Sequence, residues 1–105
     1  MAGKWVKAAR VADVAEGEVV GVRAGGEEIA LYCLGGTYHA TSNICTHEYA
    51  ELSDGFVEGG VIECPLHAGR FDICSGKALG APVSENLATY PVKVEGDHIL
   101  VELPG

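Results

Sequence analysis

The sequence predicts an all-β fold, a sandwich or barrel of short antiparallel strands. Its 105 residues include 15 glycines and one methionine, which favours many tight turns over long helices. Between the glycine turns lie short runs with the composition and alternation of strands. The expected strands are Glu18–Ala24, Glu28–Leu34, Thr37–Ser42, Gly55–Glu58, Val61–Cys64, Thr89–Glu95 and His98–Leu103. Only Val11–Glu16 could form a helical turn.

The apolar pattern assigns faces to several of these strands. Residues 29–34 are apolar at almost every position, as in a central strand that is covered on both sides. In the run 89–95, Tyr90, Val92 and Val94 fall on one face. Pro91 within that run indicates a sheet edge or a bulge, because proline cannot donate to the strand ladder.

The length fits a single domain covering residues 1–105. Residues 43–84 depart from the regular strand pattern and hold most of the cysteine and histidine. We expect them to form a smaller subdomain, carried on an antiparallel β-sandwich base made by residues 1–42 and 85–105.

Charge and hydropathy exclude several kinds of partner. Fifteen acidic residues against seven basic ones give a net charge of −8, which argues against nucleic acid and anionic membranes. The first residues lack an apolar signal segment, and no run approaches the 18 apolar residues of a membrane span. We therefore expect a cytoplasmic protein with no membrane association, whose four cysteines are metal ligands or core thiols and not disulfides.

A doubled cysteine–histidine pattern carries the chemistry. Cys45-Thr46-His47 is followed, after sixteen residues, by Cys64-Pro65-Leu66-His67. The expected hairpin between the two motifs would return the chain so that they face each other. A structural zinc site also accepts two cysteines and two histidines, although its ligands within one loop are usually spaced more widely than Cys45 and His47.

These motifs resemble those of the Rieske iron–sulfur proteins, which hold a [2Fe–2S] cluster with two cysteines and two histidines. The similarity continues through Ser53-Asp54-Gly55, Gly69-Arg70-Phe71-Asp72, Ser75-Gly76-Lys77-Ala78, Gly80-Ala81-Pro82 and residues 90–95, and so covers nearly the whole chain. The chain looks most like the small Rieske-type ferredoxins of bacterial aromatic-ring-hydroxylating dioxygenase systems, the naphthalene dioxygenase type in particular. Gly80-Ala81-Pro82 matches the proline loop that covers the cluster in this family.

The resemblance implies one Rieske [2Fe–2S] cluster, with Cys45 and Cys64 on the inner iron and His47 and His67 on the outer one. It also implies a soluble single-electron carrier with no catalytic residues of its own. The donor would be an NAD(P)H-dependent flavin reductase and the acceptor a terminal aromatic-ring dioxygenase. Two alternatives are a small Rieske subunit of an enzyme like assimilatory nitrite reductase and a zinc-stabilised interaction module.

Four positions predict a potential at the low end of the Rieske range, about −150 mV. High-potential relatives carry a disulfide where this chain has Ala50 and Leu66. They also carry hydroxyl groups, which hydrogen-bond to sulfur, where it has Gly69 and Phe71. Such bonds stabilise the reduced cluster, so their loss lowers the potential.

Several remaining residues have a structural and a functional interpretation. Glu48, Glu51, Asp54, Glu58 and Glu63 form an acidic rim that would either be ordinary solvated surface or steer a basic partner. Cys33 and Cys74 are expected to be buried packing residues. His39 and His98 are expected to be surface or edge residues and not ligands.

Overall fold

A computed structural model describes residues 3–46, 49–66, 68–81 and 83–104, and ten strands account for most of its regular structure. The strands are β1 (Lys4–Arg10), β2 (Val19–Ala24), β3 (Glu27–Leu34), β4 (Thr37–Ser42), β5 (Phe56–Glu58), β6 (Val61–Glu63), β7 (Arg70–Asp72), β8 (Thr89–Tyr90), β9 (Val92–Glu95) and β10 (His98–Leu103). Two 3₁₀ turns, η1 (Val11–Asp13) and η2 (Leu52–Asp54), are the only helical elements in the described residues. The predicted all-β class is confirmed.

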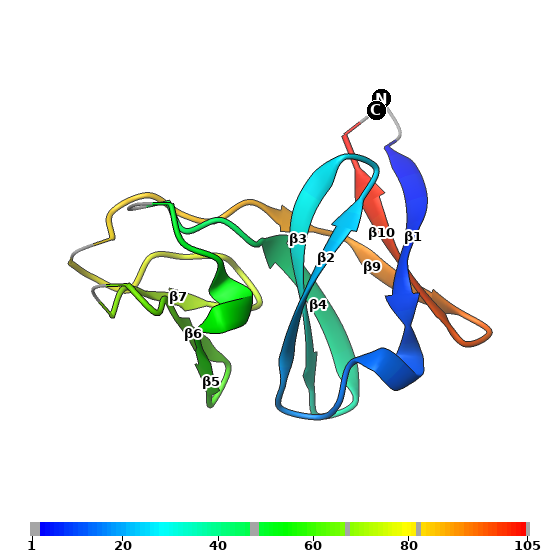
Figure 1. Cartoon of the computed structure of the whole chain (residues 1–105), viewed down its shortest axis with the longest axis horizontal. Coiled ribbons are helices and arrows are strands. Elements are labelled where there is room, and N and C mark those ends of the chain that lie inside the picture. The colour runs from blue at the N-terminus through cyan, green and yellow to red at the C-terminus, as the bar shows by residue number, and fades with distance from the viewer. Residues whose placement is uncertain (1–2, 47–48, 67, 82, 105) are drawn as a thin grey trace.

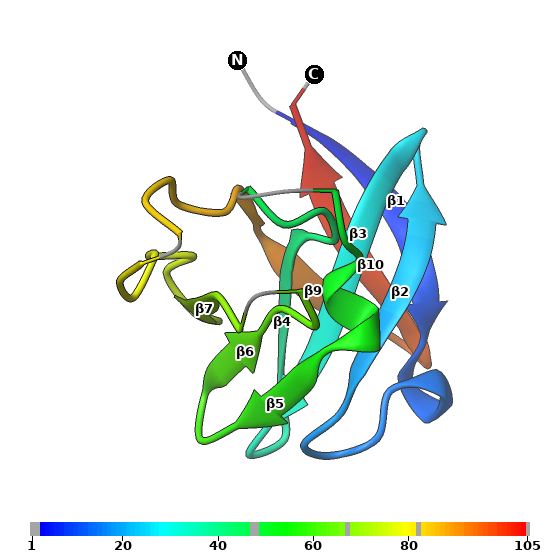
Figure 2. The same cartoon turned by 60° about the vertical axis from the view of Figure 1, so that its left-hand side comes forward.

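The strands form three antiparallel sheets. Two of them make the larger part of the molecule, with strand orders β1-β10-β9 and β2-β3-β4-β8. The third, β5-β6-β7, is smaller and lies to one side of them, while the start of β1 and the end of β10 lie side by side at another edge (Figure 1). Figure 2, turned so that the small sheet comes forward, shows β5, β6 and β7 side by side.

Strand β3 joins the two cores of the molecule. Ile29 and Leu31 point into a core shared with Ile99 and Val101 of β10, and all four are fully buried. The opposite face of β3 presents Ala30 and Tyr32 to a second core, which lies against the small sheet. The prediction of a strand covered on both sides is confirmed, because each face of β3 packs on a different sheet.

The buried hydroxyl of Tyr32 shows how the second core satisfies its polar groups. The Tyr32 hydroxyl and Thr41 Oγ1 are 2.8 Å apart, and both side chains are fully buried. Removal from water raises the pKa of Tyr32 to about 12, since burial penalises the charged phenolate. Tyr32 therefore acts here as a neutral packing residue.

The predicted run 89–95 is divided in two. Pro91 separates β8, which pairs with β4, from β9, which pairs with β10, so one segment passes from one sheet to the other. Tyr90 and Val92 pack against the first core, but Val94 is 46% exposed and does not share their buried face. β7 is not among the strands that the sequence predicts, because three residues are too few to show an alternation.

The described residues contain no helix with the length and apolarity needed to cross a bilayer.

Candidate metal centre

Two loops of the chain are closed by the same kind of backbone hydrogen bond. The first loop, residues 45–50, is closed by a hydrogen bond from the Cys45 N–H to the Ala50 carbonyl, 3.0 Å long. The second loop, residues 64–69, is closed by the equivalent bond from the Cys64 N–H to the Gly69 carbonyl, 2.7 Å long. In each loop the cysteine donates to the residue five positions later. The doubled sequence motif is therefore also a doubled backbone motif.

Both cysteines face the same apolar core. Cys45 is 5% exposed and Cys64 is 1% exposed, and both pack in the core that contains Ile62 and Phe71. Neither forms a disulfide. The backbone N–H of Leu66 donates to Cys64 Sγ at 3.4 Å, an arrangement that stabilises negative charge on the sulfur. Two buried sulfur donors in paired loops fit a sulfur-ligated iron centre.

The structure does not describe every predicted ligand. His47 and His67 lie outside the described residues, as do Glu48 and Pro82. Their described neighbours Tyr49, Leu66 and Ala68 are exposed, so both loops reach the surface beyond their buried cysteines. Ala68 has a φ of 58°, the left-handed region that alanine rarely enters. The second loop thus makes a sharp turn just before it closes at Gly69.

A third segment, described at residues 79–81 and 83–87, is hydrogen-bonded to the first loop and to the strand that follows the second. The Leu79 N–H donates to the Arg70 carbonyl at 2.9 Å, directly after the second loop. Thr46 Oγ1 of the first loop donates to the Glu85 carbonyl at 2.8 Å. Between these ties Val83 is 2% exposed and packs in the same core as the two cysteines.

The four positions expected to set the potential have definite places. Leu66 is at the surface, and Ala50 is half-buried against the core. Gly69 is buried, and Phe71 is fully buried in the core that holds Cys64. The φ of Gly69 is not in the left-handed region, so backbone conformation does not require glycine there.

The described members of the acidic rim are exposed or half-buried. Glu63 forms an ion pair with Arg70 at 3.5 Å, and the Tyr49 hydroxyl donates to Glu51 at 3.5 Å. Asp54 and Glu58 are exposed, at η2 and on β5. These carboxylates lie on and beside the small sheet, so the negative surface is on the side of the molecule that carries the cysteine loops.

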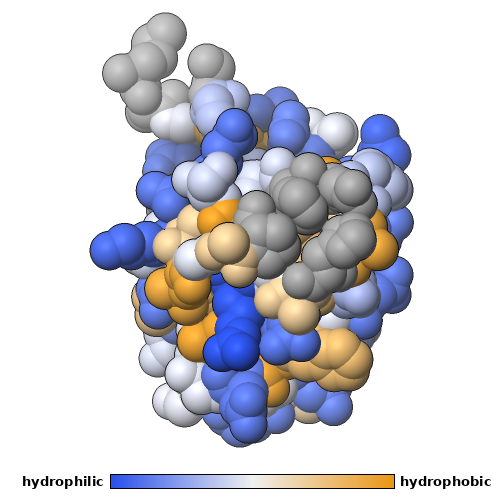
Figure 3. Space-filling view, turned by 90° about the vertical axis from the view of Figure 1, so that its left-hand side faces the viewer, coloured by the Kyte–Doolittle hydropathy of each residue, from blue (hydrophilic) through white to orange (hydrophobic). Residues whose placement is uncertain are grey.

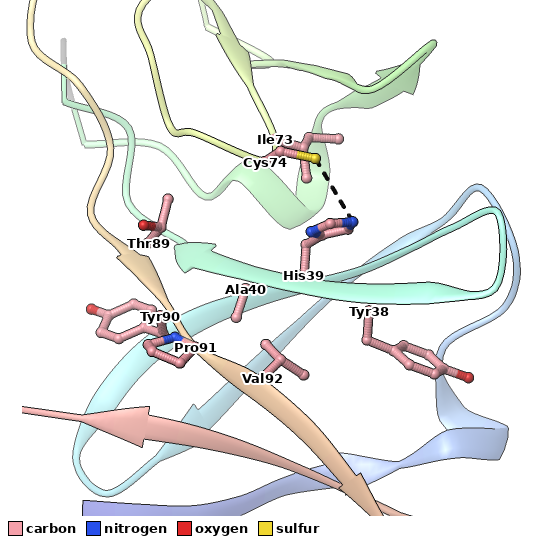
Figure 4. Close-up of a pocket in the computed structure, with 9 residues that line it drawn as sticks. All are labelled: Tyr38, His39, Ala40, Ile73, Cys74, Thr89, Tyr90, Pro91 and Val92. Atoms are coloured by element: carbon pink, nitrogen blue, oxygen red, sulfur yellow. Dashed lines mark hydrogen bonds between the residues drawn. The ribbon is translucent and has the colours of Figure 1, made fainter. Parts of the chain in front are cut away.

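The prediction that Cys74 is a buried packing residue is wrong, because its thiol is exposed. The turn after β7 directs Cys74 Sγ toward His39 Nε2, 3.8 Å away, beside an open pocket of about 350 Å³ (Figure 4). His39 comes from β4 and is half-buried, and His98 at the start of β10 is half-buried beside Asp97 at 3.1 Å. A single sequence cannot show that this turn projects outward from β7.

The prediction that Cys33 is buried is confirmed. Cys33 is 5% exposed in β3, and its thiol donates to Glu16 Oε1 at 3.5 Å. Burial, with a smaller contribution from the Glu16 carboxylate, raises the pKa of the Cys33 thiol.

Comparison with known proteins agrees with this geometry. Residues 4–91 match the Rieske [2Fe-2S] domain. The chain is 52% identical over 103 residues to the ferredoxin component of the naphthalene 1,2-dioxygenase system of Pseudomonas aeruginosa, covering 98% of this chain and 99% of that one. Among solved structures, the Sphingomonas yanoikuyae B1 ferredoxin shares 37% identity with a TM-score of 0.90, covering 96% of this chain and all of the other.

A second structural relative is found in a complex of reduced oxygenase and oxidized ferredoxin in carbazole 1,9a-dioxygenase. It shares 35% identity with a TM-score of 0.86, covering 93% of this chain and 92% of that one. The chain belongs to the Rieske [2Fe-2S] domain family. Within it the chain is an electron carrier of the ferredoxin type found in aromatic dioxygenase systems, with a single Rieske cluster as its cofactor.

Proposed function

We propose that this protein carries single electrons from an NAD(P)H-dependent flavin reductase to a terminal aromatic-ring-hydroxylating dioxygenase in the cytoplasm. The observation that carries the proposal is the pair of equivalent loops with Cys45 and Cys64 buried in one core. The 52% identity to a naphthalene 1,2-dioxygenase ferredoxin component supports the same role. These relatives favour neither a nitrite reductase subunit nor a zinc module.

The proposed ligands of the cluster are Cys45 and Cys64 for the inner iron and His47 and His67 for the outer iron. When bound, such a cluster accepts and releases one electron at a time. Cys45 and Cys64 would supply the buried sulfurs, and the Leu66 N–H would help hold negative charge on Cys64. Residues 43–84 would then form the cluster-binding subdomain, carried on the base of residues 1–42 and 85–105.

The end of the molecule that carries these loops is the proposed contact surface for both partners. Tyr49 is 75% exposed, Leu79 is 47% exposed and Leu66 is 37% exposed, one from each segment around the site. Apolar side chains alternate with polar ones on this face (Figure 3). A small apolar contact surrounded by carboxylates suits a brief electron-transfer encounter, because rapid turnover requires dissociation.

Paramagnetic resonance of the reduced protein tests the proposed cofactor and its ligands. The purified protein should be red-brown. After reduction with dithionite it should give a Rieske signal whose average g lies below the free-electron value. A colourless protein that contains zinc would contradict the proposal.

Histidine variants test the ligands individually. His47→Ala and His67→Ala should each lose the Rieske signal, because neither variant can complete the proposed histidine pair. His39→Ala and His98→Ala are the matched controls and should keep the signal, since both residues lie on strands of the base. A native Rieske signal in the His67→Ala protein would refute the ligand assignment.

A further inference from the structure

The structure leaves no room for a side chain at position 69. A Cβ built on Gly69 would lie 2.6 Å from Val83 Cγ1, closer than real Cβ contacts approach. Val83 Cβ and Cγ2 would lie 3.7 Å away, so a single methyl group of Val83 occupies the space where a side chain would begin. Since the φ of Gly69 is not in the left-handed region, this steric contact is the constraint that the structure shows at the site.

Val83 is well placed to act on the second loop through this contact. The side chain is 2% exposed and packs in the core with Cys45 and Cys64. Its segment is hydrogen-bonded to the Arg70 carbonyl on one side and to Thr46 of the first loop on the other. The Gly69 carbonyl in turn accepts the hydrogen bond of the Cys64 N–H at 2.7 Å. A displacement of Val83 would therefore be transmitted to Cys64 through Gly69.

We propose that Val83 is a positioning residue that seats residues 79–87 on the second loop and keeps position 69 without a side chain. A hydroxyl-bearing side chain at this position would have to displace the Val83 methyl group, at a cost in stability. Val83 thereby excludes from the neighbourhood of Cys64 a hydroxyl that could donate a hydrogen bond to sulfur, a bond that would raise the cluster potential. This inference rests on the proposed role of Cys64 as a ligand.

Five variants test the steric part of the proposal. Gly69→Ser and Gly69→Ala are each made in the wild-type protein and in a Val83→Ala background, and Val83→Ala alone is the reference for that background. Each single substitution at position 69 should lower Tm by about 5 °C or more and reduce the iron content, because it overpacks a buried site. Both losses should be largely recovered in the Val83→Ala background, where the obstructing methyl group is gone.

Val14→Ala is the matched control for the loss of a buried valine. Val14 is 3% exposed, but it packs in the other core, away from the cysteine loops. Val14→Ala should not restore the Tm of Gly69→Ser. The inference would be overturned if the position-69 variants had the Tm of the wild type. It would also be overturned if the Tm loss of a double variant equalled or exceeded the sum of the losses of its two single variants. A double variant that fails to fold would overturn it as well.

The reduction potential tests the functional part. The Gly69→Ser/Val83→Ala protein should shift the reduction equilibrium toward the reduced form by up to about tenfold, which is 59 mV for one electron. The Gly69→Ala/Val83→Ala protein lacks only the hydroxyl and is the reference. Equal potentials in the two double variants would contradict the claim that exclusion of a hydroxyl holds the potential low. Thermal unfolding measures the recovery of Tm whichever metal the protein holds. A failure of the proposed function would therefore leave this recovery intact, whereas a failure of this inference would abolish it.

Discussion

At the scale of single residues, Phe71 is a buried aromatic side chain in the same core as both cysteines of the proposed site. It is fully buried in the core that contains Cys64, and it pairs with Ile62 between β7 and β6. Phe71→Tyr would keep the aromatic volume and add a hydroxyl where higher-potential relatives have one. A hydrogen bond from this hydroxyl to sulfur, worth about 0.5–1.5 kcal/mol, should raise the potential by roughly 20–65 mV.

Protein-film voltammetry measures this shift, and Phe56→Tyr is the matched control. Phe56 is the other phenylalanine of the chain and is 64% exposed on β5, so its variant should leave the potential unchanged. An unchanged or lowered potential in Phe71→Tyr, with the cluster intact, would show that the missing hydroxyl at this position does not set the potential.

The four cysteines differ in exposure, and this difference is measurable. Cys74 is exposed beside His39, whereas Cys33 is buried and the pKa of its thiol is raised. In the native protein a thiol-specific alkylating reagent at neutral pH should modify Cys74 rapidly and leave Cys33 unmodified, because the thiolate is the reactive form. Peptide mass analysis identifies the alkylated residue. Cys74→Ser should abolish the rapid reaction, and rapid labelling that persists in this variant would contradict the exposed position of Cys74.

At the scale of elements, the turn between β3 and β4 is held by one carboxylate. Glu16 accepts hydrogen bonds from the N–H groups of Gly35 and Gly36, at 2.6 and 2.9 Å, and these bonds lower the pKa of Glu16 below its ordinary value of 4.5. A carboxyl whose pKa is lowered by folding stabilises the fold above its unfolded pKa, and this contribution is lost as the pH falls through the folded value.

Glu16→Gln should therefore lower Tm at pH 7 and have little effect at the acid end of the titration, below the folded pKa. Thermal unfolding of both proteins between pH 7 and pH 3 measures the difference. Glu18→Gln is the control, since Glu18 is exposed nearby, directly before β2. A Tm difference between Glu16→Gln and the wild type that does not shrink toward acid pH would contradict this role.

At the scale of the whole molecule, the net charge of −8 should influence how a charged partner approaches. Electron transfer to a partner with a basic docking patch should slow as ionic strength rises, because salt screens charges over about 10 Å at 0.1 M. Stopped-flow rates under second-order conditions measure this dependence.

Charge neutralisation locates the effect. Asp54→Asn/Glu58→Gln neutralises two residues of the acidic rim and should reduce the salt dependence. Glu95→Gln/Asp97→Asn neutralises the turn between β9 and β10, at the opposite end of the molecule from the small sheet (Figure 1). This pair should change the salt dependence of the rate less. If the two pairs of substitutions changed the salt dependence equally, the net charge would steer the encounter and the acidic rim would contribute no more than other charged surface.

Local sequence by itself determined the all-β class and the two-sided burial of β3, and it placed a sheet edge or a bulge at Pro91, where β8 and β9 are both edge strands. These features depend on the alternation of apolar and polar residues and on the chemistry of single residues. Both are properties of a short stretch of sequence and need no contact with distant residues. The two cysteine–histidine motifs and the residues around them also resemble those of the Rieske proteins, and the match of residues 4–91 to the Rieske [2Fe-2S] domain confirms that family.

Only the tertiary structure decided the features that need a distant partner. β7 exists because Phe71 pairs with Ile62 across a hairpin, and Cys74 is exposed because the following turn projects away from the small sheet toward β4. The reason for glycine at position 69 is a methyl group of Val83, fourteen positions along the chain. No local pattern encodes that contact, because it forms only when residues 79–87 fold back over the second loop.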